Sequence, residues 1–461
     1  MSGILFPCLD YMEDDKSFKE EDTSSEDEPM EAVIREKNKK VKGMKGKSKE
    51  FFDTNSQEIV SASSDNIASS TFGELNLSRP MLKAVFELGF LHPTPIQKAC
   101  IPVALAGRDM CACSATGTGK TAAFMLPIFE RLLFRPKGRR SVTRVLVLVP
   151  TRELAIQVFQ VSRKLSQFSH VDICLCAGGL DIKAQEAALR LSPDVVIATP
   201  GRLIDHLHHS PNFSLADIEV LVLDEADRLL EEGFADQMKE LIRMCAINRQ
   251  TMLFSATMTD KVEDLAKMSL KKPVRLFINE NTDTAKNLRQ EYIRIRKGKE
   301  DDREATVAAL VTRSFPDHTI VFVRTKKDCE RLNNVLCRLG VKAGQLHGGL
   351  PQSERVKALQ DFKDEKLDIL CSTDLAARGL DVDGVMTVIN MHIPTELSRY
   401  IHRVGRTARA GKVGRSISLV AEQERSILKQ IIKMNTRPIK QRVIDAEVIS
   451  SLKQSIDEMT Q

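Results

Sequence analysis

A glycine-rich segment, Ser114 to Thr121 (SATGTGKT), carries residue types that suit phosphate binding. It directly follows the apolar run DMCAC and precedes AAFMLPIFERL, whose spacing predicts a helix. Gly117 and Gly119 let the backbone bend, so that its N–H groups converge on a phosphate at the start of that helix. We expect Lys120 to reach the β- and γ-phosphates and the Thr121 hydroxyl to bind Mg²⁺. A chance match is the alternative, but the strand before and the helix after favour a nucleotide site.

A second segment, EVLVLDEAD (Glu219 to Asp227), places carboxylates at the end of an apolar strand. Carboxylates at that position point into the crevice where open α/β sheets bind ligands. We expect Asp224 to hold Mg²⁺ through water, and Glu225 to orient and deprotonate an attacking water. The alternative is an acidic helix N-terminus that only favours the helix dipole. Together with the glycine-rich segment, the pattern favours nucleotide hydrolysis.

The composition is that of a large globular protein. The chain has 461 residues, which exceeds one ordinary hydrophobic core, and it is 42% hydrophobic and 28% charged. Its longest apolar runs, such as Val145 to Val149, are far shorter than the ~18 residues of a membrane-spanning helix, so we expect a soluble protein with no membrane partner. The net charge of +5 does not by itself require a polyanionic partner.

Ten cysteines without a secretory signal indicate a reducing compartment. Two C-x-C pairs, Cys111 with Cys113 and Cys174 with Cys176, could be halves of metal sites. The C-x₂-C spacing typical of zinc sites is missing. Residues i and i+2 share one face of a strand, so packing within strands is the favoured interpretation.

Residues 1–70 differ in composition from the rest. Residues 10–31 carry eleven acidic side chains, and residues 35–49 carry eight basic ones. Such blocks offer too little apolar surface to offset the entropy of ordering, so we predict a disordered acidic and then basic tail. The basic block suits a nuclear localisation signal or a loose RNA-binding arm, and a solvated flexible run is an equally good interpretation.

After Phe72, apolar runs alternate with helical patterns. DMCAC, RVLVLV, VDICLC, DVVIA, EVLVL and TMLFS form a first set, and EYIRIR, TIVFV, VKAGQLH, LDILCS, GVMTVIN and RSISLV form a second. Strands that are apolar throughout and linked by helices predict parallel sheets covered on both faces. A polar stretch around residues 279–287 separates the two sets, so we predict two α/β lobes in tandem.

The DEAD sequence at Asp224 to Asp227, with the rest of the chain from about Phe72 to Val443, resembles the DEAD-box family of ATP-dependent RNA helicases. The resemblance implies two tandem RecA-like domains with parallel sheets, ATP and Mg²⁺ as cofactors, and RNA as a partner. The implied boundaries are a tail at 1–70, an ATP-binding domain with a Q motif at 71–278, a C-terminal helicase domain at 279–445, and a short tail at 446–461.

The resemblance extends to the nucleotide contacts. GFLHPTPIQ, Gly89 to Gln97, is similar to the family's adenine-recognising Q motif, in which the Gln97 amide bonds both edges of adenine. The full set implied for the nucleotide is Phe72, Phe90, Thr94, Gln97, Ser114, Ala115, Thr116, Gly117, Thr118, Gly119, Lys120, Thr121 and Asp381.

The resemblance also implies contacts to RNA and contacts that couple the two lobes. PTRELA, a Gly-Gly pair and TPGR match RNA-backbone motifs of the first lobe, and VFVRT matches one of the second. The implied RNA set is Pro150, Thr151, Arg152, Gly178, Gly179, Thr199, Pro200, Gly201, Arg202, Arg324, Thr325, Gln352, Arg355, Thr373 and Asp374. The implied coupling set is Asp227, Ser255, Thr257, Arg378 and His402.

HRVGRTARAG, His402 to Gly411, resembles the family's arginine-finger motif. It implies that Arg406 and Arg409 reach the γ-phosphate, which makes them catalytic with Lys120, Asp224 and Glu225. Fingers of this kind contribute on the order of 10³ to 10⁵ in rate. Ala408 replaces a commoner glycine and Leu375 a usual valine, and both changes are conservative.

Several phrases, among them LNLSRPMLKAV and HLHHSPNF, resemble the nucleolar branch that assists assembly of the large ribosomal subunit. That resemblance implies pre-rRNA and pre-ribosomal proteins as partners, a nuclear and nucleolar location, and a monomeric helicase core. Two alternatives stay open: an ATP-timed RNA clamp without significant unwinding, and a DNA helicase. The chain has three Tyr and no Trp, so we expect contacts to the RNA backbone rather than base stacking.

Overall fold

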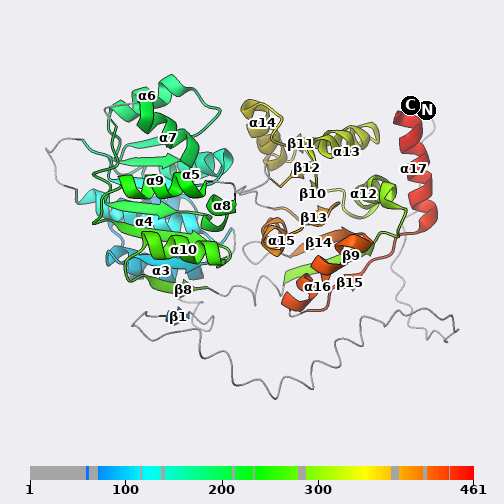
Figure 1. Cartoon of the computed structure of the whole chain (residues 1–461), viewed down its shortest axis with the longest axis horizontal. Coiled ribbons are helices and arrows are strands. Elements are labelled where there is room, and N and C mark those ends of the chain that lie inside the picture. The colour runs from blue at the N-terminus through cyan, green and yellow to red at the C-terminus, as the bar shows by residue number, and fades with distance from the viewer. Residues whose placement is uncertain are drawn as a thin grey trace, which may run out of the picture. The chain divides into compact units, whose positions relative to one another are not determined.

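The computed structural model describes residues 59–61, 71–114, 117–135, 141–209, 213–231, 234–278, 287–374, 384–408, 413–435 and 437–460. The described residues form two β-sheets, each with helices along the chain between its strands (Figure 1). All strand pairs in both sheets are parallel. This confirms the predicted α/β class with parallel sheets.

The first sheet has eight strands in the order β1-β8-β2-β7-β6-β3-β5-β4. Their bounds are β1 Ile59–Ser61, β2 Met110–Cys113, β3 Val145–Leu148, β4 Ile173–Cys176, β5 Val195–Ala198, β6 Val220–Leu223, β7 Gln250–Ser255 and β8 Val274–Phe277. The helices of this lobe are α2 Arg79–Glu87, α3 Pro95–Leu105, α4 Lys120–Leu133, α5 Arg152–Leu165, α6 Ile182–Arg190, α7 Pro200–His209, α8 Ala226–Glu231, α9 Ala235–Met244 and α10 Asp260–Ser269, with a 3₁₀ turn η3 at Phe72–Leu75.

The second sheet has seven strands in the order β11-β12-β10-β13-β14-β9-β15. Their bounds are β9 Leu288–Arg294, β10 Thr319–Val323, β11 Ala343–Leu346, β12 Ile369–Thr373, β13 Thr387–Asn390, β14 Gly414–Val420 and β15 Lys440–Gln441. The helices are α12 Arg303–Ala309, α13 Lys326–Arg338, α14 Gln352–Lys363, α15 Leu397–Val404, α16 Arg425–Met434 and α17 Ala446–Thr460, with short turns η5 Glu300–Asp302, η6 Leu310–Ser314 and η7 Glu422–Glu424.

The central strands of the first sheet feed two cores. On β3, Val145 and Val147 belong to the cluster that includes side chains from α2 to α5, whereas Leu146 and Leu148 belong to the cluster that includes side chains from α7, α9 and α10. Successive side chains of a strand point to opposite faces, so a sheet covered on both faces requires apolar residues at every position. The uninterrupted apolar runs of the sequence are the consequence of this double burial.

The second sheet is covered in the same way. On β10, Val321 and Val323 pack in a cluster that includes side chains of α12, α13 and α17. Ile320 and Phe322 face the other way, toward Leu359 and Phe362 of α14. In each sheet, the carboxyl ends of the parallel strands lie along one edge, which is where ligands bind in open α/β sheets.

Three strands were not predicted from the sequence. β8 extends the first sheet beyond β2, and β1 pairs with β8 in parallel. β1 lies inside the segment predicted as a disordered tail, so residues 59–61 differ from that prediction; the rest of residues 1–70 lies outside the described residues. β15, with two exposed residues, pairs with β9. Short edge strands lack the long apolar runs that mark buried ones.

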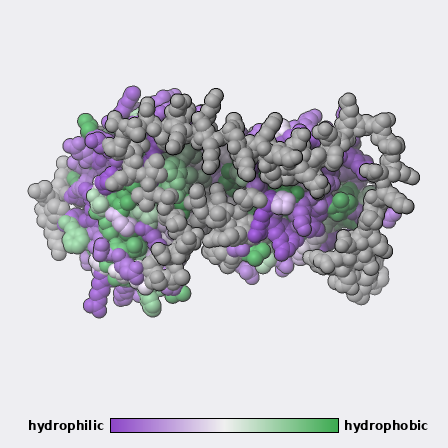
Figure 2. Space-filling view, turned by 90° about the horizontal axis from the view of Figure 1, so that it is seen from below, coloured by the Kyte–Doolittle hydropathy of each residue, from purple (hydrophilic) through white to green (hydrophobic). Residues whose placement is uncertain are grey.

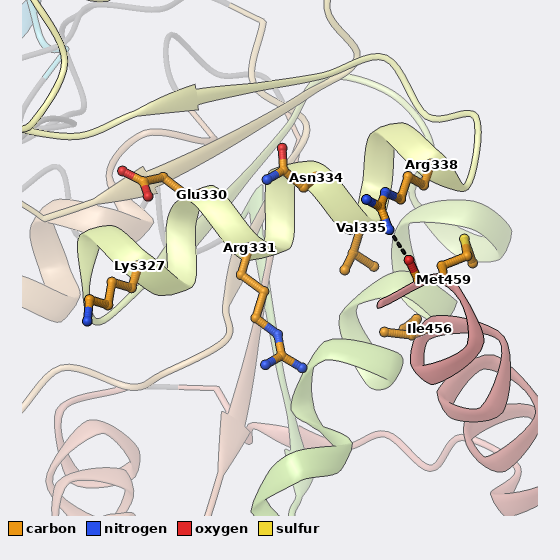
Figure 3. Close-up of a pocket in the computed structure, with 8 residues that line it drawn as sticks. All are labelled: Lys327, Glu330, Arg331, Asn334, Val335, Arg338, Ile456 and Met459. Carbon is orange, nitrogen blue, oxygen red and sulfur yellow. Dashed lines mark hydrogen bonds between the residues drawn. The ribbon is translucent and has the colours of Figure 1, made fainter. Parts of the chain in front are cut away.

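Residues 446–461, predicted as a short tail, contain the helix α17. Its side chains Ile449, Leu452 and Ile456 pack against the core of the second lobe, and Lys453 Nζ lies 2.6 Å from Asp302 Oδ1. A pocket of about 300 Å³ lies between α13 and α17, where Val335 and Ile456 face each other and Arg338 donates to the Met459 carbonyl (Figure 3). The helix is held by burial of one apolar face.

The surface carries scattered apolar side chains. Phe86, Leu91, Phe134, Leu191 and Ile247 are among the most exposed. In the view of Figure 2, hydrophobic residues lie among hydrophilic ones on the described part of the surface. Within the described ranges, no helix is long and apolar enough to cross a membrane.

A first prediction concerns the core of the first lobe. The rings of Phe124 and Phe254 are fully buried with centroids 5.3 Å apart. We expect Phe254→Ala to lower the free energy of unfolding of this lobe by about 3–5 kcal/mol, because it removes the ring and leaves a cavity. Chemical denaturation with a lobe-specific probe measures this. Phe86→Ala, at a side chain 78% exposed, is the control and should change stability by less than about 0.5 kcal/mol; equal losses would contradict the assignment.

Candidate nucleotide and nucleic-acid site

The glycine-rich segment lies between β2 and α4, as predicted. Gly119 is the residue before α4 and has φ = 89°, in the left-handed region that favours glycine. A Cβ at Gly119 would lie 2.5 Å from Gln97 Nε2, so a larger residue would displace the glutamine. The buried Lys120 donates from Nζ to the Ser114 carbonyl at 3.1 Å, and the Ser114 and Thr118 hydroxyls lie 2.8 Å apart. Ala115 and Thr116 lie outside the described residues.

The Q-motif residues pack against this loop. The Thr94 N–H donates to Gln97 Oε1 at 2.9 Å, and Gln97 Nε2 donates to the Gly119 carbonyl at 3.1 Å. Both ends of the amide therefore bond to protein, and an adenine that used it would replace at least one of these bonds. Phe90 is partly exposed near the start of α3, whereas Phe72 is buried in the lobe core. The structure thus brings Thr94 and Gln97 to the loop.

The acidic segment begins where β6 ends. Asp224 and Glu225 are both buried, and the Glu225 N–H donates to Asp224 Oδ1 at 2.9 Å. Glu225 has φ = 50°, a left-handed conformation that is uncommon for a residue with a side chain. Burial raises the pKa of Asp224 to about 6, and the positive charge of Lys120 opposes that shift. Glu225 lies 3.3 Å from the Arg228 guanidinium, so Asp224 is the buried carboxylate whose charge a further cation or proton would compensate.

This donor set fits Mg²⁺. The ion is usually held by one or two carboxylates together with substrate phosphates and water, so a larger cluster of protein ligands is not needed. Asp224 offers a buried carboxylate whose charge burial disfavours, and a divalent cation would stabilise the ionised form. Thr121, in the first turn of α4, is partly exposed at the same edge of the sheet. These two residues would hold the ion.

Asp227 joins the two lobes. Its Oδ2 accepts from the Thr257 N–H at 3.2 Å and from the Thr257 hydroxyl at 2.9 Å, and it lies 3.4 Å from His402 Nε2. Burial disfavours the charge, but His402, Arg228 and Thr257 outweigh it and hold the pKa of Asp227 well below its usual range. The carboxylate is therefore ionised and tied to both lobes.

The coupling residues Ser255 and Thr257, next to Asp227, are joined to each other by a hydrogen bond. The Ser255 hydroxyl donates to the Thr257 carbonyl at 2.7 Å, which fixes the turn after β7. His402 is buried, and burial together with the nearby Arg228 lowers its pKa. The structure therefore brings together four of the five predicted coupling residues; Arg378 lies outside the described residues.

The predicted RNA residues of the first lobe lie along neighbouring strand ends. Thr151 caps α5, with its hydroxyl accepting from the Leu154 N–H at 3.3 Å. A Cβ at Gly178 would lie 2.8 Å from the Arg152 guanidinium, and one at Gly179 equally close, so the guanidinium rests against the Gly-Gly turn. Arg202 donates to the Leu180 carbonyl at 3.3 Å. The predicted set from Thr199 to Arg202 forms the start of α7.

The predicted RNA residues of the second lobe lie at strand ends of that sheet. Arg324 is exposed and lies 3.2 Å from Glu424, and Thr325 caps α13 by accepting from the Asp328 N–H at 3.1 Å. Thr373 is buried at the end of β12. Asp374 pairs with the buried Arg403, whose Nη2 lies 2.7 Å from Asp374 Oδ2.

Gln352 and Arg355 of α14 contact the first lobe. Gln352 Nε2 donates to Glu153 Oε1 at 2.8 Å, and Arg355 Nη2 lies 2.9 Å from the same oxygen. Glu153 and Arg355 are both buried. Sequence reasoning did not single out Glu153, although it lies inside the PTRELA motif.

The arginine-finger segment is described in part. Arg406 is buried, its Nε donates to the His402 carbonyl at 3.1 Å, and its charge helps to lower the pKa of Glu225. The predicted finger Arg406 is thus close to the predicted catalytic carboxylate. Arg409 and Asp381 lie outside the described residues. Sequence reasoning also missed Arg403 and Arg228, which lie next to predicted residues in their motifs.

Two family models match the chain. The model described as DEAD/DEAH box helicase matches residues 94–265, and the one described as helicase conserved C-terminal domain matches residues 302–411. A human protein named probable ATP-dependent RNA helicase DDX27 is 56% identical over 444 residues, covering 95% of this chain and 57% of that protein. ATP-dependent RNA helicase DRS1 of Mycosarcoma maydis is 48% identical, covering 88% of this chain and 47% of that protein.

Two solved structures resemble this chain over most of its length. Mss116p bound to single-stranded RNA and AMP-PNP is 29% identical with a TM-score of 0.75, covering 87% of this chain and 85% of that chain. S. cerevisiae Dbp5 bound to RNA and ADP BeF3 is 29% identical with a TM-score of 0.72, covering 85% of this chain and all of that chain.

The two domains and their motif-bearing strand ends define a two-domain helicase core of the RecA-like type. The chain belongs to the DEAD-box family of ATP-dependent RNA helicases. It spans about half the length of the curated relatives it matches.

A second prediction concerns the contact between the lobes. We expect Glu153→Gln to raise the RNA concentration that half-maximally stimulates ATP turnover by at least about tenfold, because it leaves the Arg355 guanidinium without its counter-charge; breaking a buried pair costs about 3–5 kcal/mol, and each 1.4 kcal/mol is tenfold. A titration of ATPase activity with single-stranded RNA measures this. Glu240→Gln, at an exposed glutamate of α9 that faces His208, is the matched control and should change the midpoint less than twofold. An unaltered midpoint for Glu153→Gln would contradict a role for the pair.

Proposed function

We propose that this chain is an RNA-stimulated ATPase that locally separates short RNA duplexes or remodels RNA–protein complexes. One observation carries the proposal: Asp227, which follows the predicted catalytic Glu225 by two residues, is bonded to Thr257 in the first lobe and lies against His402 in the second. A change at the nucleotide is thereby connected to the position of the second lobe. The names of the relatives, which specify ATP-dependent RNA helicases, support the same activity.

In the proposed mechanism, the phosphate loop binds ATP through its backbone N–H groups and Lys120. Mg²⁺ held by Asp224 and Thr121 would neutralise charge that develops on the phosphates. Glu225 orients a water in line with the γ-phosphorus and accepts its proton. Arg406 stabilises the charge that builds on the transferred phosphoryl group. ADP and phosphate are the products.

RNA is proposed to bind along the strand-end residues of both lobes through its phosphates and ribose 2′-hydroxyls. Arg152, Arg202 and Arg324 supply positive charge, so affinity should fall with salt. ATP and RNA each favour the closed arrangement of the lobes, which makes their binding mutually reinforcing. Closure bends one strand and expels its partner, and loss of phosphate reopens the lobes.

We further propose that the RNA is a precursor of ribosomal RNA, that the partners are pre-ribosomal proteins, and that the protein works in the nucleolus. The branch-specific phrases of the sequence support this. Crosslinking the bound RNA in cells and sequencing it tests the proposal, and a distribution without enrichment of rRNA precursors would overturn it.

A third prediction tests the activity. ATP turnover with and without single-stranded RNA is compared for the natural chain and Glu225→Gln, in which the amide cannot accept the proton. We expect RNA to stimulate the natural chain, and the variant to lose about 10²- to 10⁴-fold in kcat while it still binds nucleotide. Equal turnover in all four samples would refute the proposal. Replacing RNA by single-stranded DNA distinguishes an RNA helicase from a DNA helicase. A duplex-release assay at limiting ATP distinguishes an unwinding enzyme from an RNA clamp.

A fourth prediction tests the arginine finger. Arg406→Ala should keep nucleotide affinity within a few-fold but lose about 10³-fold or more in hydrolysis, because the guanidinium stabilises charge that is present chiefly in the transition state. Binding of a fluorescent ATP analogue and steady-state turnover measure the two effects separately. Full turnover by the variant would exclude this assignment.

A further inference from the structure

Arg228 is the residue directly after the DEAD sequence, and its guanidinium lies between two functional side chains. Its Nη1 is 3.3 Å from Glu225 Oε2, and its Nε donates to His402 Nδ1 at 3.3 Å. Its backbone N–H donates to Asp227 Oδ1 at 3.2 Å. Arg228, Glu225 and His402 are each at least 95% buried. No role in the proposed reaction has yet been given to this arginine.

The local backbone explains why Arg228 faces Glu225. Glu225 adopts φ = 50°, and α8 starts at the next residue. The Arg228 N–H bonds to the Glu225 carbonyl at 2.9 Å, which closes the first turn of the helix. Residues three apart lie on the same side of a helical turn, so the guanidinium is brought over the carboxylate.

The bond to His402 fixes the position of a proton. An arginine Nε–H can only donate, so His402 Nδ1 must accept and carries no hydrogen. The imidazole proton is then on Nε2, which lies 3.4 Å from Asp227 Oδ2 without making a hydrogen bond of good geometry to it. Arg228 therefore selects the tautomer in which His402 can donate to Asp227.

The contact between Arg228 and Glu225 leaves one oxygen of the carboxylate able to accept a further hydrogen bond. Glu225 Oε2 and Arg228 Nη1 are close enough for an ion pair, yet neither buried atom makes a hydrogen bond of good geometry. Buried polar atoms are usually satisfied, and an exception calls for an explanation such as a catalytic role or a bound water. A water held at this oxygen would be oriented by a carboxylate that the arginine keeps in place.

We propose that Arg228 is a positioning residue that ties Glu225 to His402, so that the carboxylate is set for hydrolysis when His402 of the second lobe is docked. The proposal rests on the proposed ATPase function. Arg228 acts through Glu225 and His402 and need not touch the nucleotide. It thereby makes hydrolysis depend on the arrangement of the lobes that RNA favours.

The test uses the full chain with Arg228→Met and Arg228→Lys. Methionine keeps an unbranched apolar stem and removes the charge and the Nε and Nη donors, whereas lysine keeps the charge opposite Glu225 without the planar fork. At saturating RNA we expect Arg228→Met to lower kcat about 10- to 100-fold with KM for ATP changed less than about threefold, the pattern of a lost transition-state contribution. For Arg228→Lys, the loss in log kcat should be smaller than that of Arg228→Met by at least about a third, because the positive charge is restored.

The link to His402 is tested by His402→Ala and the double variant Arg228→Met/His402→Ala. If the arginine acts partly through the histidine, the loss in kcat of the double variant is smaller than the product of the single losses, by at least about threefold. Losses that multiply fully would overturn the link. Wild-type kcat in Arg228→Met would overturn the proposal as a whole.

The control is Arg249→Met. Arg249 is a partly buried arginine of the same lobe, and its Nη1 donates to the Ala246 carbonyl. Arg249→Met should leave kcat within twofold of the natural chain.

Binding of a fluorescent ATP analogue and the thermal unfolding midpoint are measured for every variant. A kcat loss in Arg228→Met that is matched by loss of analogue binding and not relieved by lysine would overturn the positioning role, since it would show a folding defect. If the natural chain itself shows no RNA-stimulated turnover, the proposed function fails first, and the two failures are thus distinguishable.

Discussion

The buried carboxylate of Asp227 is the interaction on which the rest of the site depends. A charge in that environment is tolerated only with close partners, and the partners come from distant parts of the chain: Thr257 after β7, and His402 in α15. The two hydrogen bonds from Thr257 satisfy the buried carboxylate, and losing them would leave it unpaired on that side. The strand ends of the first sheet are thereby connected to the second lobe through a few side chains of defined geometry.

The parallel sheets are what make this arrangement possible. In both sheets the strands run in the same direction, so every functional turn emerges at the same edge. β2 delivers the phosphate loop, β6 the acidic segment, and β7 the turn with Ser255 and Thr257. These strands are consecutive in the sheet, in the order β2-β7-β6, although β2 ends at Cys113 and β6 begins only at Val220. The double burial of each strand stabilises the frame, and the turns remain available for chemistry.

Ion pairs in this protein differ in what they contribute. Surface pairs such as Lys239 with Asp236 are solvated and contribute little. The buried pair of Glu153 with Arg355 is shielded from water, so it fixes the relative positions of the elements that carry it. The buried Arg403 pairs with the partly exposed Asp374. Several residues predicted to contact RNA, among them Gln352 and Arg355, are thus held in place by protein partners.

The sequence by itself determined the fold class and the chemistry of the main motifs, because apolar periodicity and motif spacing are local properties. The apolar runs predicted twelve of the strands, and the SATGTGKT and DEAD segments indicated which strand ends carry function. The strands β1, β8 and β15 and the helix α17 were not predicted, since these short strands lack a long apolar run and α17 is held by packing on α12 and α13. The tertiary structure alone decided the partners: that Gln97 bonds to Gly119, that Glu153 meets Arg355, and that Arg228 lies between Glu225 and His402. Apart from the local pair of Arg228 with Glu225, these contacts join residues 22 to 202 positions apart, and a hydrogen bond depends on distances that no local pattern records.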